Sequence, residues 1–390
     1  DGRTLLATGG DDRTVRIWDP LAGTPIGQPL TTHTDGVRAV ATFTAPDGRT
    51  LLATAGDRTV RVWDPLAGTP IGEPLTGHTG WVWAVVTFTA PDGRTLLATG
   101  GDDRTVRLWD PLAGTPVGQP LTGYIGGVLA VAAFTAPDGR TLLATGGDDD
   151  TVRVWDPLAG TPIGQPLTGH TRWVRAVAAF TAPDGRTLLA TGGDDRTVRI
   201  WDPLAGTPIG QPLTDHTDWV RAVATFTAPD GRTLLATGGD DRTVRIWDPL
   251  AGTPVGQPLT GHSGWVWAVA TFTAPDGRTL LATGGDDRTV RLWDPLAGTP
   301  VGQPLTGHTG GVLAVAAFTA PDARTLLATG GHDGTVRIWD AHNHLLLMRI
   351  VTAGSVHSLA FVPSSSRGTQ GLAIAGSAGF AFFEVRLDGL

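Results

Sequence analysis

Short apolar runs alternate with clusters of Gly, Pro and Asp along almost the whole chain. One representative stretch, residues 77–122, reads GHTGWVWAVVTFTAPDGRTLLATGGDDRTVRLWDPLAGTPVGQPLT. Four of its runs are rich in β-branched or apolar residues: VWAVVTFT, RTLLAT, TVRLWD and TPVGQPLT. The turn sequences APDG, GGDD and PLAG separate them. This alternation predicts four short β-strands, which we name a, b, c and d in chain order.

Two of the four runs indicate where they lie in a sheet. Run d contains Pro116 and Pro120, and proline cannot donate to a strand ladder, so run d should be an edge strand. Run a is built largely of Val and Ala, which suit a crowded inner position. Four antiparallel strands with a small inner strand and a proline-bearing outer strand describe one blade of a β-propeller, so we expect an all-β fold.

The pair Trp-Asp closes run c at a spacing of 45 residues and then of 46 residues, at Trp18, Trp63, Trp109, Trp155, Trp201, Trp247, Trp293 and Trp339. With Gly-His before run a, Thr in run b and Asp in the b–c turn, this order resembles the WD-repeat β-propeller family. The resemblance covers essentially the whole chain. Near-identical repeats of this type are similar to the sensor or scaffold halves of larger bacterial proteins, actinobacterial ones included. That likeness implies a fused upstream effector, such as an ATPase, protease or kinase domain, outside this chain.

Eight blades are the expected number. Residues 20–390 contain eight d-a-b-c units, which would be closed by pairing of the N-terminal strand d with the last blade, and residues 1–19 would remain as a leftover b–c hairpin. In that last blade SVHSLAFV, GLAIAG and GFAFFEV would be strands a, b and c. The variable sequence WVW at 81–83 returns at 265–267, as expected for a duplicated four-repeat unit. Seven blades, with residues 1–64 as the tail of another propeller, and nine open blades are the alternatives.

A polar set of His, Thr, Asp and Trp recurs in most repeats. An activated hydroxyl is one interpretation. A nucleophile site is not needed in every blade, however, so we favour a structural role and expect no catalytic residue and no enzyme activity. The family resemblance implies that each set forms a hydrogen-bonded network. The five complete sets are His78, Thr99, Asp103 and Trp109; His170, Thr191, Asp195 and Trp201; His216, Thr237, Asp241 and Trp247; His262, Thr283, Asp287 and Trp293; and His308, Thr329, Asp333 and Trp339.

Two repeats depart from this set. One has Tyr124 in place of His, which should leave its network incomplete. Another has His33, Thr54, Asp57 and Trp63, with one residue fewer in its b–c turn.

Charge and composition exclude several other classes of function. The chain has no Cys, and its His residues lie at repeat spacing, so we expect no metal site and no cofactor. The net charge of −8 argues against nucleic-acid binding. The longest apolar run, near residues 345–351, is too short to cross a membrane, and we expect no signal peptide before Asp1. We therefore expect a soluble, cytoplasmic protein.

The six Trp residues outside the Trp-Asp pairs all fall at two positions, i and i+2, at the start of run a. Both positions point to one side of the strand. Elsewhere the same slots hold Arg, Gly or Leu, and a buried position should not change from Gly to Trp between near-identical copies. Because Trp and Arg dominate binding hot spots, these residues are our candidate partner site. They are Trp81, Trp83, Trp173, Arg175, Trp219, Arg221, Trp265, Trp267 and Arg38.

The resemblance places these slots at the channel rim, on the face where partners most often bind. In an eight-bladed ring Trp81 and Trp83 would face Trp265 and Trp267 across the channel. We predict a non-catalytic scaffold or sensor that binds a protein or peptide. Alternatives are side chains that merely plug the channel mouth, a lectin-like carbohydrate site, and a recently amplified or engineered array with no evolved ligand.

Overall fold

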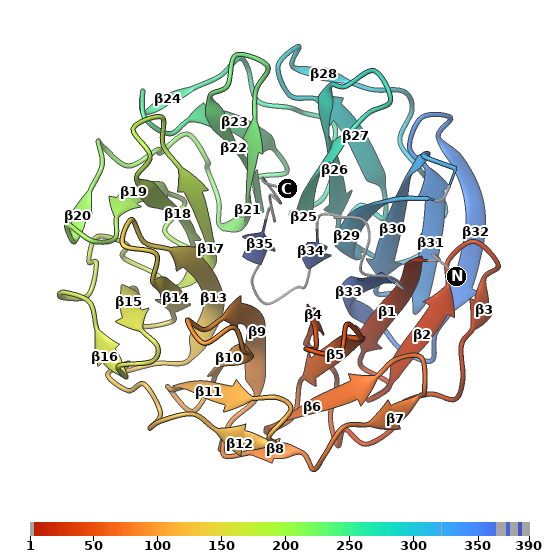
Figure 1. Ribbon diagram of the computed structural model, residues 1–390. Helices are drawn as coiled ribbons and strands as arrows, with labels where there is room; N and C mark the ends of the chain where they lie inside the picture. Colours follow the sequence, from red (N-terminus) through yellow and green to blue (C-terminus); the bar gives the residue numbers. More distant parts are fainter. Residues whose placement is uncertain (1–3, 321, 364–371, 375–380, 384–390) are drawn as a thin grey trace.

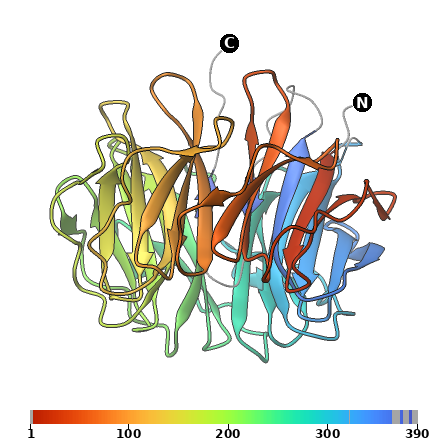
Figure 2. The same cartoon turned by 90° about the horizontal axis from the view of Figure 1, so that it is seen from below.

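Eight antiparallel sheets form the blades of a ring around a central channel (Figure 1). The computed structural model describes residues 4–320, 322–363, 372–374 and 381–383, and all regular structure within them is β-strand. Seen from the side, the ring is a thick disc with the strands running between its two faces (Figure 2). The predictions of an all-β propeller and of eight blades are confirmed.

Each blade has one strand at each of four positions. The inner strands, a, are β33 (Val356–Pro363), β4 (Ala39–Thr44), β9 (Val82–Thr89), β13 (Val128–Thr135), β17 (Val174–Thr181), β21 (Val220–Thr227), β25 (Val266–Thr273) and β29 (Val312–Thr319). The second strands, b, are β1 (Thr4–Gly10), β5 (Thr50–Ala55), β10 (Thr95–Gly101), β14 (Thr141–Gly147), β18 (Thr187–Gly193), β22 (Thr233–Gly239), β26 (Thr279–Gly285) and β30 (Thr325–Gly331).

The third strands, c, are β2 (Val15–Asp19), β6 (Thr59–Asp64), β11 (Val106–Asp110), β15 (Val152–Asp156), β19 (Val198–Asp202), β23 (Val244–Asp248), β27 (Val290–Asp294) and β31 (Thr335–Asp340). The outer strands, d, are β3 (Thr24–Pro25), β7 (Thr69–Pro70), β12 (Thr115–Pro116), β16 (Thr161–Pro162), β20 (Thr207–Pro208), β24 (Thr253–Pro254), β28 (Thr299–Pro300) and β32 (Leu345–Val351). We number the blades 1 to 8 in this order of their a strands. Blade 2 has a further short strand, β8 (Leu75–Thr76), on β6.

The outer strands of blades 1 to 7 are short for the reason that the sequence indicated. In blade 6, β24 pairs with β23 only through Trp247↔Pro254 and Asp248↔Thr253. Beyond the proline the ladder shrinks to a single bridge, Val244↔Leu259. Proline lacks the N–H that would continue the ladder, so these strands are confirmed as edges.

The apolar core lies between neighbouring blades. Trp247 of blade 6 is 1% exposed and packs against Leu188, Val198 and Ile200 of blade 5. The same arrangement places Trp201 against blade 4 and Trp155 against blade 3. Each blade therefore depends on its neighbours for burial, as in other repeat proteins, and closure of the ring removes the two open ends.

The closing blade differs from the domain boundary that the sequence led us to expect. Blade 1 takes strands b, c and d from the N-terminus (β1, β2, β3) and strand a, β33, from the C-terminal part. β1 pairs with β33 through Leu6↔Phe361 and Thr8↔Leu359. Residues 1–19 are thus not a spare hairpin, because the part of them that the structure describes forms two strands of blade 1. The ring closes on three N-terminal strands rather than on strand d alone.

The repeat pattern explains this exchange. β1 and β2 carry the full apolar pattern with Trp18, whose indole N–H donates to the Thr8 hydroxyl at 3.0 Å. The segments GLAIAG and GFAFFEV lack a Trp-Asp pair, and β33 can pair with only one b strand. Of those two segments the structure describes β34 (Leu372–Ile374) and β35 (Ala381–Phe383), and the rest lies outside the described residues. β34 and β35 pair with each other inside the ring (Figure 1).

Candidate functional site

The recurring polar set forms a chain of hydrogen bonds within each blade. In blade 6 the Trp247 indole N–H donates to the Thr237 hydroxyl at 2.8 Å, and that hydroxyl lies 2.7 Å from His216 Nε2. His216 Nδ1–H donates to Asp241 at 2.8 Å, because the carboxylate can only accept. The backbone N–H of Thr217 donates to the same carboxylate at 3.0 Å. The set thereby ties the d–a loop and the b–c turn to strand c.

The other sets named from the sequence have the same connections. Those of His78, His170, His262 and His308 each join Trp, Thr, His and Asp, and the set of His33 does so in the shorter turn of blade 2. The Thr hydroxyls are buried and already bonded, so they cannot reach a substrate in solvent.

Two blades have altered sets. In blade 4 the buried Tyr124 hydroxyl bonds the Thr145 hydroxyl, and the Asp149 carboxylate keeps the backbone bond from the Ile125 amide at 3.2 Å but has no side-chain bond from Tyr124. Burial raises the pKa of Tyr124, so the phenol stays neutral. In blade 1 the Ala353 amide donates to Asp12 at 3.3 Å, across the join between the two ends of the chain.

Hydrogen bonds within the sets control the ionisation of their carboxylates. Burial acts to raise the pKa of Asp241, but bonds from His216, Thr243 and Thr217 outweigh it and lower the pKa to about 2. Asp195 has the same balance and the same pKa of about 2. The carboxylates therefore remain charged in the folded protein well below their ordinary pKa of 3.8.

Acid should destabilise the ring through these carboxylates. A carboxyl whose pKa is lowered by folding stabilises the protein above its unfolded pKa, and this stabilisation is lost as the pH falls from about 4 toward 2. For Asp241 the contribution is on the order of 2 kcal/mol. We expect Asp241→Asn to lower the free energy of unfolding at pH 7 and to flatten its pH dependence between pH 4 and 2, measured by urea unfolding. The exposed Glu73→Gln is the control, and a pH dependence unchanged in Asp241→Asn would contradict this assignment.

The residues predicted to line the rim lie at the starts of the inner strands, beside the b–c turns. The backbone N–H of Asp240 in one such turn donates to the Trp219 carbonyl at 2.8 Å. Trp81, Trp173 and Trp265 are 42–44% exposed. The remaining six are half-buried: Trp83, Trp219, Trp267, Arg38, Arg175 and Arg221. In contrast, Leu129 and Leu313, which occupy the same slot in blades 4 and 8, are buried.

Two of the rim arginines are held by the acidic turns of their own blades. Arg175 forms an ion pair with Asp194 at 2.9 Å, and Arg221 donates two hydrogen bonds to Asp240 at 2.9 and 2.7 Å. Each guanidinium also lies over a neighbouring indole, at 4.5 Å from the Trp173 ring for Arg175 and at 4.6 Å from the Trp219 ring for Arg221. The carboxylates of Asp194 and Asp240 are therefore neutralised by arginines of their own blades.

The third rim arginine, Arg38, has a different partner because its own, shorter turn has Gly56 alone where most other blades have Gly-Asp. It reaches instead to Asp11 of blade 1, at 3.2 Å, and lies 2.9 Å from His357 Nε2. Sequence reasoning missed this contact between blades. The missing carboxylate at Gly56 was the signal that could have indicated it.

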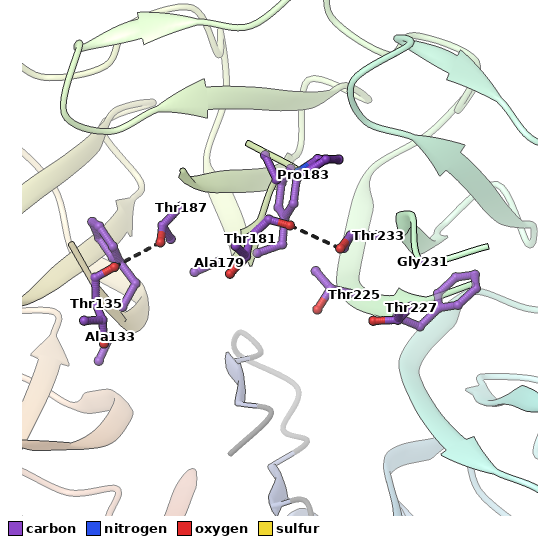
Figure 3. Close-up of a pocket in the computed structure, with 14 residues that line it drawn as sticks. Ala133, Thr135, Ala179, Thr181, Pro183, Thr187, Thr225, Thr227, Gly231 and Thr233 are labelled. Atoms are coloured by element: carbon purple, nitrogen blue, oxygen red, sulfur yellow. Dashed lines mark hydrogen bonds between the residues drawn. The ribbon is translucent and has the colours of Figure 1, made fainter. Parts of the chain in front are cut away.

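The end of the channel opposite the rim residues contains a cavity of about 570 Å³. It lies at the ends of three inner strands and is lined mainly by Thr, Phe and Ala (Figure 3). At its wall the Thr187 hydroxyl donates to the Thr135 carbonyl at 3.0 Å, and Thr233 donates to Thr181 at 3.2 Å. These bonds join the b strand of one blade to the a strand of the blade before it, so this end of the channel serves blade packing.

In the described part of the chain, no group of three or more His, Asp or Glu side chains is placed to hold a metal ion. Nor does that part contain a helix with the length and apolar character needed to cross a membrane.

Comparison with known proteins gives one family. The family model described as WD domain, G-beta repeat matches residues 1–19, 23–64, 68–110, 114–156, 160–202, 206–248, 252–294 and 298–340. Among solved structures, the crystal structure of the computationally designed Ika8 protein is similar, with a TM-score of 0.65 and 24% sequence identity over 88% of this chain and 95% of that one. This likeness concerns the fold alone. A comparison with curated proteins found no match.

Proposed function

Because the chain belongs to the WD40 repeat family, we propose that it is a non-catalytic scaffold or sensor that binds a protein or peptide through its Trp- and Arg-lined rim. Propellers of this family typically mediate protein–protein interactions. We name the proposed site the Trp/Arg rim, and it consists of Trp81, Trp83, Trp173, Arg175, Trp219, Arg221, Trp265, Trp267 and Arg38.

The observation that carries this proposal is the exposure of three large indoles at one equivalent position. Trp81, Trp173 and Trp265 leave 42–44% of their surface in contact with solvent. Other copies of the repeat place Gly at that position without disturbing the blade. An indole that the fold does not need for packing is well suited to be buried by a partner, since aromatic residues are enriched in interface hot spots.

The surroundings of the indoles also favour recognition over filling of the channel mouth. A plug would be expected to bury its aromatic rings fully, whereas these three indoles keep 42–44% of their surface exposed. The backbone beneath them is held by the bonded sets described above, so a partner would meet a rigid surface with little ordering cost. Charged groups at the rim, such as Arg175 with Asp194, provide a polar edge around the aromatic positions.

Affinity capture from a lysate of the source organism tests this function. The bait variant changes Trp81, Trp83, Trp265 and Trp267 to Ala, and we expect it to lose the partners that the native chain retains, identified by mass spectrometry. The matched control changes four exposed leucines of c–d turns to Ala: Leu158, Leu204, Leu250 and Leu296, which are 44–46% exposed.

All three baits must first show equal circular dichroism and equal unfolding midpoints. A partner lost by the Trp variant and kept by the Leu variant would support the Trp/Arg rim. Equal capture by native chain and Trp variant would place recognition elsewhere on the molecule, and carbohydrate recognition would appear as binding to a glycan array without protein capture.

A further inference from the structure

Two stretches with the same sequence, WVW, lie opposite each other in the ring but have different surroundings. Blades 3 and 7 are four blades apart in a ring of eight, so Trp81 and Trp83 face Trp265 and Trp267 across the channel. The rings of the first pair lie 5.7 Å apart and those of the second 6.1 Å apart. The inference drawn from their comparison rests on the proposed function of the Trp/Arg rim.

The pair in blade 3 already holds a cation from the chain itself. The Arg38 guanidinium lies 6.0 Å from the Trp81 ring and 5.8 Å from the Trp83 ring. Its charge is balanced by Asp11, and the Trp83 indole N–H donates to Asp102. The protein thus contains its own example of a guanidinium held by two indoles beside carboxylates, an arrangement favoured by cation–π attraction.

The pair in blade 7 lacks such a cation. The arginine in the matching slot of the preceding blade is Arg221, and both of its hydrogen bonds go to Asp240. In the b–c turn, blade 2 has Gly56 alone where blade 6 has Gly239 and Asp240, so the carboxylate that is missing in blade 2 is what retains the arginine in blade 6. Among the described residues, no arginine has a cation–π contact with Trp265 or Trp267.

A carboxylate without a cation lies beside this second pair. Asp286 is exposed, and in the described part of the chain its side chain has no hydrogen bond or ion pair. A β-carbon built on Gly311 would lie 2.7 Å from the Trp267 ring and 3.0 Å from an Asp286 carboxylate oxygen, so both groups border this glycine. His332 packs edge-to-face on Trp267 at 5.3 Å and leaves Trp265 open to solvent.

We propose that Trp265, Trp267 and Asp286 form a binding site for an arginine side chain of the partner. The two indoles supply aromatic faces, and Asp286 supplies the negative charge that a guanidinium requires. Arginine suits the site better than lysine because its planar, weakly hydrated group stacks on aromatic rings. Arg38 occupies the twin site, so the free chain presents one such site rather than two.

The test uses the peptide acetyl-Gly-Arg-Gly-amide and the same peptide with citrulline, which keeps the shape of arginine without its charge. Titration is followed by NMR of the Trp indole N–H signals, with the number of sites measured by equilibrium dialysis. We expect one arginine peptide per chain and about tenfold weaker binding of the citrulline peptide, as the loss of a cation–π contact and a charge pair implies. Trp265→Ala and Asp286→Asn should each weaken binding similarly. The control is Leu296→Ala, on the opposite face of blade 7.

A gain of binding provides the sharper readout. Arg38→Ala should vacate the twin pair and raise the number of bound arginine peptides from one toward two, with new shifts at the Trp81 and Trp83 indole signals. Equal binding of the citrulline peptide, full binding by Trp265→Ala, or no added site in Arg38→Ala would each overturn the proposal. If capture of a partner still depended on the rim Trp residues in that case, the proposed function would stand and only the arginine specificity would fail.

Discussion

Deletion of residues 1–19 is expected to open the ring and abolish its cooperative unfolding. The deletion removes β1 and β2, the two middle strands of blade 1. Leu5 packs on the side of blade 2, next to Trp63, and Trp18 packs on the side of blade 8. Loss of the buried side chains of this hairpin removes about 10 kcal/mol of apolar burial or more, which is comparable to the whole net stability of a typical domain. Guanidinium unfolding and size-exclusion chromatography would measure the effect.

Complementation supplies the control for this deletion. A synthetic peptide of residues 1–19, added in excess to the truncated chain, should restore the single unfolding transition because it replaces the missing strands against β33. A peptide with Trp18→Ala should restore it less well, since Trp18 is 5% exposed. If the truncated chain unfolds like the native one, the last blade completes itself from residues 371–385, and the boundary expected from the sequence is right.

The structure of a single blade could be predicted from the sequence because the information is local. Turn residues bound each strand, prolines identify the outer edge, and the count of d-a-b-c units favours eight blades over seven or nine. The bonded sets of His, Thr, Asp and Trp also follow from positions within one repeat, together with the family pattern. Because the repeats are nearly identical, these features recur at the same positions and can be recognised in the sequence.

Which strands pair and which side chains contact one another between blades could not be predicted in the same way. Two segments could serve as strand b for β33, and the strand pattern alone does not say which of them pairs. Arg38 differs from Arg175 only through what surrounds it, because Gly56 leaves it without a carboxylate in its own blade. Likewise the Leu129 slot was expected to be partly exposed, but the smaller side chain is buried at the channel wall.

Trp247→Ala should cause the largest loss of stability of any single substitution considered for this ring. Trp247 is 1% exposed and fills the space between blades 5 and 6, and its indole N–H donates to Thr237. Replacing a buried Trp by Ala leaves a cavity and typically costs 3–5 kcal/mol. We expect a loss of about 4 kcal/mol in the free energy of unfolding, from denaturant curves with an unchanged slope.

Trp81→Ala is the matched control, since it removes the same side chain from a site that is 42% exposed. Its effect on the free energy of unfolding should stay below about 1 kcal/mol, as is usual for surface substitutions. The two variants distinguish the two kinds of Trp in the chain: those that are buried between blades and those that are exposed at the rim. Equal losses in both variants would mean that Trp81 belongs to the core, and its assignment to a recognition surface would then be wrong.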